Sequence, residues 1–532
     1  MRNILATILG LILPLLLLVS IQYYDVLKID TAVAVTKEMI EKEVRIPVDH
    51  SKFKILNQDF KTGPEVTAVC LSCHNKRHEE IMQTSHWKWE RKEELKGKGV
   101  VPLGKKNILN NFCIGTSSNE ETCTRCHIGY GWKDKSFDFT EPTNIDCLVC
   151  HDKSGTYKKK KGGAGHVDES VSLQYVAKNV GSPGRDNCGV CHFWGGGGNN
   201  VKHGDLEKAM LDCSREVDVH MGADGANMSC VECHKTKNHQ MQGKLYALSS
   251  ENKNRMNCEE CHTSTPHSDD VLNEHILRIA CQTCHIPVYA KVNSTKMIWD
   301  WSTAGELDEN GHAKHEPDAD GNHKYMSIKG TFVWDDHVVP EYYWFNGIAN
   351  HQLITDKIDT IPLQMNSLAG CYKDKGLCQE SVSPSKIWPV KVHRGKQPYD
   401  PINNNLIQLK TYGYDGSGAF WSDFDWNASA QVGMDYLGLP YSGEYDFVQT
   451  EMYWPLNHQV SPKEQSLKCI DCHTRNGGRL ADLNDFYLPG RDSNAFVEWG
   501  GILFIILSIG GSLIHAACRI IFRKNCKYNT NN

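Results

Sequence analysis

The chain has 532 residues, of which 23% are charged, and its formal net charge at pH 7 is −6. This slightly acidic balance excludes the basic surface that nucleic-acid binding requires, so we expect no nucleic-acid partner. The length alone would allow two to four domains.

The first feature in chain order is an apolar run at residues 4–21, which follows Arg2. A basic residue before an apolar run predicts an export signal or an N-terminal signal anchor within residues 1–34. The nearest small-x-small cleavage sequence is residues 32–34, well past the apolar run. A removed peptide and an uncleaved anchor therefore both remain open.

The pattern Cys-x-x-Cys-His occurs eight times. In c-type haem attachment the two thiols add to the porphyrin vinyl groups, and the adjacent histidine binds the iron from one face. Zinc knuckles also contain Cys-x-x-Cys pairs, but zinc does not require the histidine that follows every such pair here. We therefore predict eight c-type haems, with their iron, as cofactors. The attachment cysteines are Cys70, Cys73, Cys123, Cys126, Cys147, Cys150, Cys188, Cys191, Cys230, Cys233, Cys258, Cys261, Cys281, Cys284, Cys469 and Cys472, and the proximal histidines are His74, His127, His151, His192, His234, His262, His285 and His473.

Seven of the motifs lie within residues 70–285, which leaves little polypeptide for a conventional core. The porphyrins must then supply much of the buried apolar surface. We expect a haem-packed, mainly α fold with long irregular connections, and helices at residues 66–94 and 271–280.

The segment between the seventh and eighth motifs, residues 287–468, is rich in Trp, Tyr, Gly, Asn and Asp and contains turn pairs such as Asn310-Gly311. We expect this insertion to wrap the haem array. Within it, Cys371 and Cys378 are predicted to form a disulfide because the segment is exported, with two free thiols as the alternative.

Residues 499–518 form an apolar stretch whose one strongly polar side chain is His515. Its length predicts a transmembrane helix, and the basic residues that follow place the C-terminus in the cytoplasm. The expected domains are a periplasmic catalytic domain (35–495), a C-terminal transmembrane helix (496–521) and a cytoplasmic tail (522–532). The haems then lie at the periplasmic face of the inner membrane, and a quinol-oxidising or b-type cytochrome partner is expected there. His515 contacts such a partner or lies at the membrane interface.

A haem with protein ligands on both faces relays electrons, whereas one with a displaceable ligand can bind a substrate. The chain has 25 histidines, enough outside the motifs to give every iron a second ligand. The candidates for distal ligands, most of them close to a motif, are His86, His166, His203, His220, His239, His267, His275, His393 and His458.

Several strings of this chain resemble the octahaem tetrathionate reductases, and the resemblance covers about residues 66–479. Motif order and the long gap before the eighth motif agree with that family as well. The strings are NNFCIGTSSNE (110–120), CTRCHIGYGWKDKSFDFT (123–140), DCLVCHDKSGTYKK (146–159), NVKHGDL (200–206), CQTCHIP (281–287), WDWSTAG (299–305) and GEYDFVQTEMYWPL (443–456).

The resemblance implies a relative of the hydroxylamine oxidoreductase and multihaem nitrite reductase haem arrangements. It further implies that a small inorganic substrate (tetrathionate, nitrite or hydroxylamine) is reduced at a haem whose distal ligand is a lysine. Carried over by position, that lysine is Lys202. The haem is the second one, attached to Cys123 and Cys126 with His127 as its proximal ligand, and Cys113 lies beside it. A calcium ion near the active haem is implied by the family alone, because no acidic cluster here has calcium-loop spacing.

Each of these residues has chemistry suited to the implied role. Burial lowers the pKa of a lysine toward the neutral form that binds iron, and a displaced Lys202 could bind an anion or deliver a proton. A Cys113 thiolate could attack an S–S bond and leave a mixed disulfide for reduction. The alternatives are a solvated lysine and, for Cys113, a buried thiol or a disulfide with Cys213. Asn199 departs from the family, in which an acidic residue is expected at that place, so proton delivery or anion preference would differ.

Three functions compete. The first is a membrane-tethered reductase of sulfur or nitrogen oxo-substrates, in which the other haems relay electrons. The second is an electron carrier between quinol oxidation and an external acceptor, which would need neither Lys202 nor Cys113. The third is a hydroxylamine or hydrazine oxidase, which generally carries a tyrosine crosslink to its catalytic haem.

Overall fold

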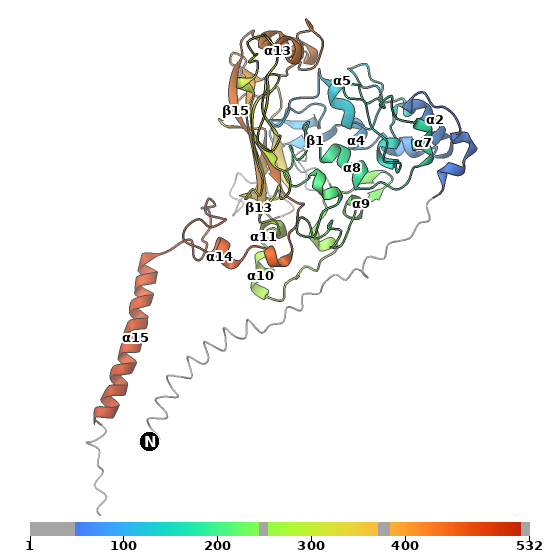
Figure 1. The fold of residues 1–532 in the computed structure, drawn as a ribbon. Coiled ribbons are helices and arrows are strands. Elements are labelled where there is room, and N and C mark those ends of the chain that lie inside the picture. Colours follow the sequence, from blue (N-terminus) through green and yellow to red (C-terminus); the bar gives the residue numbers. More distant parts are fainter. Residues whose placement is uncertain (1–47, 244–253, 371–383, 523–532) are drawn as a thin grey trace, which may run out of the picture. The chain divides into compact units, whose positions relative to one another are not determined.

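The computed structural model describes residues 48–243, 254–370 and 384–522 (Figure 1). The predicted signal or anchor and the predicted disulfide between Cys371 and Cys378 lie outside the described residues.

The described residues form two compact units. The first unit combines residues 263–273 with 468–522, and the second combines residues 48–262 with 274–467. The second unit thus contains seven of the eight Cys-x-x-Cys-His motifs, and the first contains the eighth.

Most helices of the motif-bearing segments are short. α2 (Gly63–Cys73) begins at Thr62, whose side chain caps the helix by accepting from the Glu65 amide, and it ends at the first motif, where the His74 amide donates to the Cys70 carbonyl. The other helices before residue 300 are α3 (Arg77–Ile81), α4 (Ser85–Lys88), α5 (Glu120–Cys123), α6 (Leu148–His151), α7 (Leu173–Lys178), α8 (Arg185–His192), α9 (Cys230–Cys233), α10 (Asp270–His275) and α11 (Cys281–His285).

The two predicted helices are shorter than expected. Residues 66–94 contain three helices instead of one, because the chain bends after each of them and Trp89 takes a left-handed φ of 52°. A strand, β1 (Arg91–Leu95), follows that bend. The second predicted helix, residues 271–280, is present only as α10.

The prediction of a mainly α fold is only partly met, because residues 287–468 contain a nine-stranded sheet where irregular connections were expected. β13 and β15 form its longest antiparallel pair, from Val390 opposite Pro455 to Tyr399 opposite Asp446, and they lie side by side in Figure 1. The strands are β5 (Thr295–Asp300), β6 (His315–Pro317), β7 (His323–Met326), β8 (Gly330–Asp335), β9 (Glu341–Phe345), β11 (Leu363–Gln364), β13 (Lys386–Asp400), β14 (Asn405–Leu406) and β15 (Asp446–Pro455).

The remaining elements of the second unit are smaller, and α14 (Cys469–Cys472) belongs to the first unit. The smaller elements are the two-stranded sheets of β1 with β2 (Gly99–Leu103), β3 (Thr236–Lys237) with β4 (Gln240–Met241), and β10 (Ile348–His351) with β12 (Asn366–Ala369), and the helices α12 (Phe420–Asp423) and α13 (Trp426–Leu437).

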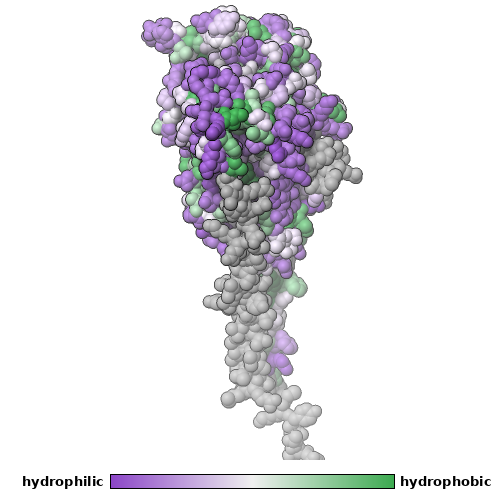
Figure 2. Space-filling view, turned by 90° about the vertical axis from the view of Figure 1, so that its right-hand side faces the viewer, coloured by the Kyte–Doolittle hydropathy of each residue, from purple (hydrophilic) through white to green (hydrophobic). Residues whose placement is uncertain are grey.

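One buried cluster joins the large sheet to the segments that carry the candidate catalytic residues. Phe112 and Val201, the neighbours of Cys113 and Lys202, pack there with Trp454 of β15. The sheet therefore positions both candidates, although they are far apart in the sequence. Away from such clusters, the face drawn in Figure 2 is mostly hydrophilic and interrupted by small apolar patches.

A long helix closes the described part of the chain. α15 (Ala495–Ile521) begins at Asn494, whose side chain accepts from the Phe496 and Val497 amides. It is the one described helix that is long and apolar enough to cross a membrane, and its apolar side chains are exposed.

Candidate functional site

The second motif is held by α5 and the turn that follows it. His127 is fully buried, and one of its ring nitrogens lies 2.6 Å from the Trp87 carbonyl oxygen. The other nitrogen has no partner among the described residues. Burial lowers the pKa of His127 to about 3, so the ring is neutral at physiological pH. A neutral imidazole can bind a metal. In His127 the carbonyl contact is to Nε2 and the unpartnered nitrogen is Nδ1, whereas in His151 and His234 a backbone carbonyl contacts Nδ1.

Aromatic side chains surround that imidazole. Trp87, Trp89 and Trp132 lie with ring centroids 5.2, 5.3 and 4.7 Å from that of His127. Phe137 and Phe139 follow at 5.8 and 6.0 Å. This apolar shell keeps water away from the ring.

Lys202 reaches the second motif from a different part of the chain. Its amine lies 4.9 Å from the Trp454 ring centroid and 5.8 Å from that of Phe112. It makes no hydrogen bond or ion pair with a described residue. Burial and, to a smaller extent, the charge of Lys105 lower the pKa of Lys202 to about 7, and Cys126 opposes both effects. Lys202 thus faces an attachment cysteine of the second motif as an amine that is easily neutral.

The loop that carries Lys202 is held from the sheet. The buried Lys391 amine of β13 donates to the Val201 carbonyl at 2.8 Å and to the Thr295 hydroxyl at 2.6 Å. Gly204 has a φ of +84°, and a Cβ there would lie 2.7 Å from the Tyr289 ring. No larger residue fits at that position, so the glycine fixes the path of the loop.

Cys113 is the second candidate that the fold brings to this motif. It is half-buried between two core clusters, and its amide donates to the Asn110 side chain at 2.7 Å. Its thiol faces that of Cys123. Cys213 lies elsewhere, in a cluster with Phe193, and both cysteines are free thiols. The alternative of a disulfide between Cys113 and Cys213 is therefore wrong.

Both polar atoms of the Asn199 side chain form hydrogen bonds. Its amide nitrogen donates to Asn293 at 2.8 Å, and its oxygen accepts from the Lys208 backbone amide at 2.7 Å. The structure therefore gives Asn199 a part in shaping the loop.

Four pairs of histidine rings have almost the same spacing, 6.1 to 6.3 Å between centroids. Two imidazoles on opposite faces of one iron have centroids about 6 Å apart, because each metal–nitrogen bond is about 2 Å. The pairs fit a haem between them, and each contains one motif histidine. They are His50 with His74, His86 with His192, His220 with His262, and His234 with His458.

His50 was missed as a distal candidate. It lies 24 residues before its partner, ahead of the first motif, and its Nδ1 bonds the Val48 carbonyl at 3.0 Å. Closeness to a motif, the signal that selected the other candidates, would have found it. His351 was also passed over, although it is buried with both ring nitrogens unpartnered among the described residues.

The surroundings of the other six predicted distal histidines differ from one another. His203 packs edge-on against Trp454, His239 bonds Glu80 at 2.7 Å, and His393 is fully buried beside Phe112 with both ring nitrogens unpartnered among the described residues. His166 lies at the surface beside Gly131, the His267 amide donates to Asn273 at 3.0 Å, and His275 ends α10.

Attachment cysteines of different motifs lie close to one another throughout the second unit. Their neighbourhoods link the first motif to the third, the second to the fourth, the fourth to the fifth, and the sixth to the seventh. Cys150 also lies near Cys188, and Cys233 near Cys261, which joins these pairs into one series. The close pairs are Cys70 with Cys147, Cys126 with Cys191, Cys188 with Cys230, and Cys258 with Cys281.

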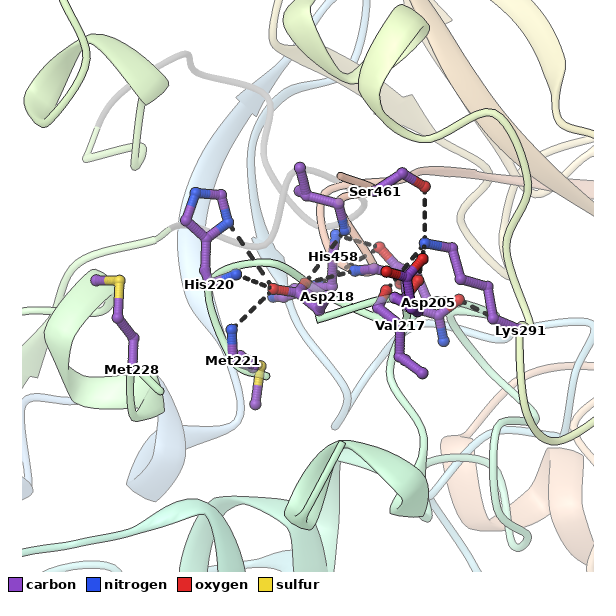
Figure 3. A network of polar contacts seen from close by, with 12 residues as sticks. Asp205, Val217, Asp218, His220, Met221, Met228, Lys291, His458 and Ser461 are labelled. Carbon is purple, nitrogen blue, oxygen red and sulfur yellow. Dashed lines mark hydrogen bonds and ion pairs between the residues drawn. The ribbon is translucent and has the colours of Figure 1, made fainter. Parts of the chain in front are cut away.

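A network of buried carboxylates braces two of the paired histidines (Figure 3). Asp205 accepts from the His458 backbone amide at 2.9 Å and lies 3.4 Å from its Nδ1. This contact raises the pKa of His458 against the effect of burial, which lowers it. Asp218 accepts from the His220 amide at 2.8 Å and lies 3.8 Å from its Nδ1. Both acids are almost completely buried.

The eighth motif, in the first unit, lies close in sequence to α15. His473 bonds the Pro489 carbonyl through Nδ1 at 2.8 Å. Two residues later, one guanidinium nitrogen of Arg475 donates to both carboxylate oxygens of Glu498, at 2.7 and 2.8 Å, in the first turn of α15.

Comparison with known proteins identifies related chains. The family model described as "Cytochrome c bacterial" matches residues 296–476, and that of cytochrome c554 and c-prime matches residues 69–152. The solved structure of octaheme cytochrome c from Shewanella oneidensis is 46% identical, with a TM-score of 0.73 over 81% of this chain and 95% of that chain. An uncharacterized protein from Archaeoglobus fulgidus is 25% identical over 243 residues, 36% of this chain and 80% of its own.

Proposed function

This chain belongs to the octahaem c-type cytochromes, and we propose that it is a membrane-anchored reductase acting on a sulfur or nitrogen oxo-substrate at its second haem. Membership confirms the predicted c-type haems and an oxidoreductase in general. The specific reaction is the proposal. It rests on one observation: Lys202 and Cys113, which a carrier does not need, face the two attachment cysteines of the same motif.

In this reading Lys202 is the displaceable ligand. The haem supplies an iron that can bind a lone pair and exchange electrons. Once released from the iron, the Lys202 amine would take up a proton, and its ammonium would bind the substrate anion or give the proton to it. Trp454 and Phe112 hold the side chain in this position without neutralising it.

Cys113 would act on tetrathionate. Its thiolate attacks one sulfur of the central S–S bond, so that a mixed disulfide with one thiosulfate forms and the other thiosulfate leaves. Two electrons then restore the thiolate and release the second thiosulfate. Nitrite and hydroxylamine contain no S–S bond and would not need this step.

The other haems would relay electrons. We propose the four histidine pairs as axial pairs of the first, fourth, fifth and sixth haems. The close approach of attachment cysteines from different motifs would then allow electrons to pass in one series from the first motif to the seventh, with the second reached through the fourth. Stored electrons suit a multielectron reduction, because reactive intermediates need not escape.

The direct test is turnover by the purified holoprotein. Reduced viologen dye is supplied as electron donor, and its oxidation is followed after addition of tetrathionate, nitrite or hydroxylamine. Substrate-dependent oxidation supports a reductase. A protein that is reduced by the dye but oxidises it with none of the three is an electron carrier, and one that reduces an acceptor with hydroxylamine as donor is an oxidase.

Replacing Asp205 with asparagine is expected to raise the midpoint potential of one haem. The carboxylate beside His458 favours the more positive, oxidised iron, and its loss removes that preference. The expected shift is on the order of 65–130 mV, the one-electron equivalent of a charged hydrogen bond. Spectroelectrochemical titration measures it. Asp212→Asn, at an exposed position of the same loop, is the control, and equal titration curves for Asp205→Asn and wild type would contradict the assignment.

We also propose that α15 anchors the protein in the cytoplasmic membrane. Its exposed apolar side chains support this, and the Arg475–Glu498 ion pair would hold the eighth haem where electrons from a quinol-oxidising partner enter the array.

Ending the chain after Ser493 is expected to move the protein from the membrane fraction to the soluble periplasmic fraction, with its haem spectrum and dye-driven turnover preserved. Removal of an apolar helix abolishes the interaction with lipid and leaves the catalytic unit intact. Fractionation followed by haem staining measures this. Retention in the membrane fraction would show that α15 is not the anchor and would transfer that role to the N-terminal segment.

A further inference from the structure

Lys296 of β5 is a buried lysine beside Cys113. Its amine donates to the Phe112 carbonyl at 2.8 Å and lies 3.7 Å from the Trp299 ring centroid. The titratable groups near it are Cys113, Lys329 and Lys391, and burial lowers the pKa of Lys296 well below its ordinary value.

Lys329 approaches the same thiol from the turn between β7 and β8. Its amine lies 5.2 Å from the Trp421 ring centroid and has no hydrogen bond or ion pair with a described residue. The groups that face it are Cys113, Lys161 and the attachment cysteine Cys123. Two elements of the sheet therefore bring cations to one side of Cys113.

These cations have no carboxylate among the groups that face them. Burying ammonium groups without an anion is costly, because they lose hydration and repel one another. Lys105 adds a further positive charge near the second motif. Burial accordingly lowers the pKa of both Lys296 and Lys329, and an anion bound beside them would restore their charge and pair with it.

We infer that Lys296 and Lys329 recognise the negative charge of the substrate beside Cys113, and so select oxoanions over neutral nitrogen compounds. This inference rests on the proposed reductase function and extends it, because it assigns specificity to two residues outside the second motif. Lys296 also fixes the Phe112–Cys113 backbone, whereas Lys329 is free to follow the anion.

A haem propionate is the competing partner. Lys329 lies near Cys123, and the vinyl substituents that thiols attack lie on the porphyrin edge opposite the propionates. That position favours a substrate anion, and the experiment below separates the two.

The test uses the holoprotein with Lys329→Met, which keeps the length of the side chain and removes its charge. KM for nitrite and for tetrathionate is expected to rise about tenfold or more, as for the loss of a charged contact. KM for hydroxylamine, which is uncharged at pH 8, is expected to stay within about twofold. Lys324→Met, at an exposed position on β7, is the matched control.

Two results would overturn the inference. One is an equal rise of KM for hydroxylamine. The other is an unchanged KM for the anions together with a shifted midpoint potential of one haem, which would identify a propionate as the partner of Lys329. Lys296→Met, with its haem spectrum checked for correct folding, is expected to follow Lys329→Met.

A binding measurement keeps this result separate from the reductase proposal. If wild type turns over none of the three compounds, calorimetric titration of the oxidised holoprotein with nitrite and with tetrathionate replaces kinetics. Binding that weakens about tenfold or more in Lys329→Met supports the anion site while the reductase proposal fails. Absence of anion binding to wild type overturns the inference.

Discussion

Replacing Lys202 with leucine is expected to lower kcat for nitrite and for tetrathionate by about 100-fold or more. Leucine has a similar volume and preserves packing against Trp454, but it can neither bind an anion nor deliver a proton. The loss should therefore appear in kcat with all haems still attached. Steady-state assays with a viologen dye, together with a haem stain of the purified variant, measure both properties.

The matched control for this change is Lys208→Leu, an exposed lysine six residues further along the same segment. It removes the same charge without reaching the second motif, so its kcat should equal that of wild type. A Lys202→Leu variant with wild-type kcat would show that the amine takes no part in turnover. The role of Lys202 would then reduce to filling space beside Phe112 and Trp454.

Replacing Cys113 with serine is expected to separate the substrates. Tetrathionate reduction should fall by about 100-fold or more, because a hydroxyl is not a nucleophile toward sulfur at neutral pH. Nitrite reduction should change by less than about threefold, since it involves no thiol step and serine retains the hydrogen-bonding capacity of the site. Parallel assays of the two substrates on one preparation measure the ratio directly.

Cys213→Ala provides the control for removal of a thiol, because Cys213 lies in a separate cluster with Met210 and Met221. If Cys113→Ser lowers both activities equally, the thiol has a structural role at the site. If it lowers neither, tetrathionate is reduced without a covalent step.

The haem-binding part of the molecule could be predicted from the sequence because its signal is local. Each motif places two thiols and an imidazole within five residues, and no tertiary information is needed to read it. The convergence of Lys202 and Cys113 is different. They are 89 residues apart in the sequence, and only the resemblance to a family linked them before the structure placed both beside the second motif.

The large sheet was missed for a physical reason. The sequence of β13 contains Val, Ile, Trp and Tyr in the alternating pattern of a strand, but the surrounding Asn, Asp and Gly favoured a reading as irregular turns. Long-range pairing, such as that of β13 with β15, overrides such local signals. The anion-recognising lysines lie on or beside this sheet, so they could not be found from the sequence either.

The distal ligands could be predicted from the sequence only in part. Three of the nine histidine candidates have ring centroids 6.1 to 6.3 Å from that of a motif histidine, the spacing expected for two ligands of one iron. These three were selected because they lie near a motif in the sequence. Asp205 could not be identified in the same way, because its contact with His458 requires the chain near residue 458 to return to the loop at residues 205–218. The contact of Asp218 with His220 is local, since the two are adjacent but one in the sequence.

Low-temperature electron paramagnetic resonance of the oxidised holoprotein tests the central claim most directly. Wild type is compared with Lys202→Leu, and each is titrated with nitrite and with tetrathionate. A lysine-ligated second haem predicts one low-spin signal that is present in wild type, is replaced by a high-spin signal in Lys202→Leu, and is perturbed by substrate. Identical spectra for the two proteins, unchanged by either substrate, would contradict the reductase and identify the protein as an electron carrier.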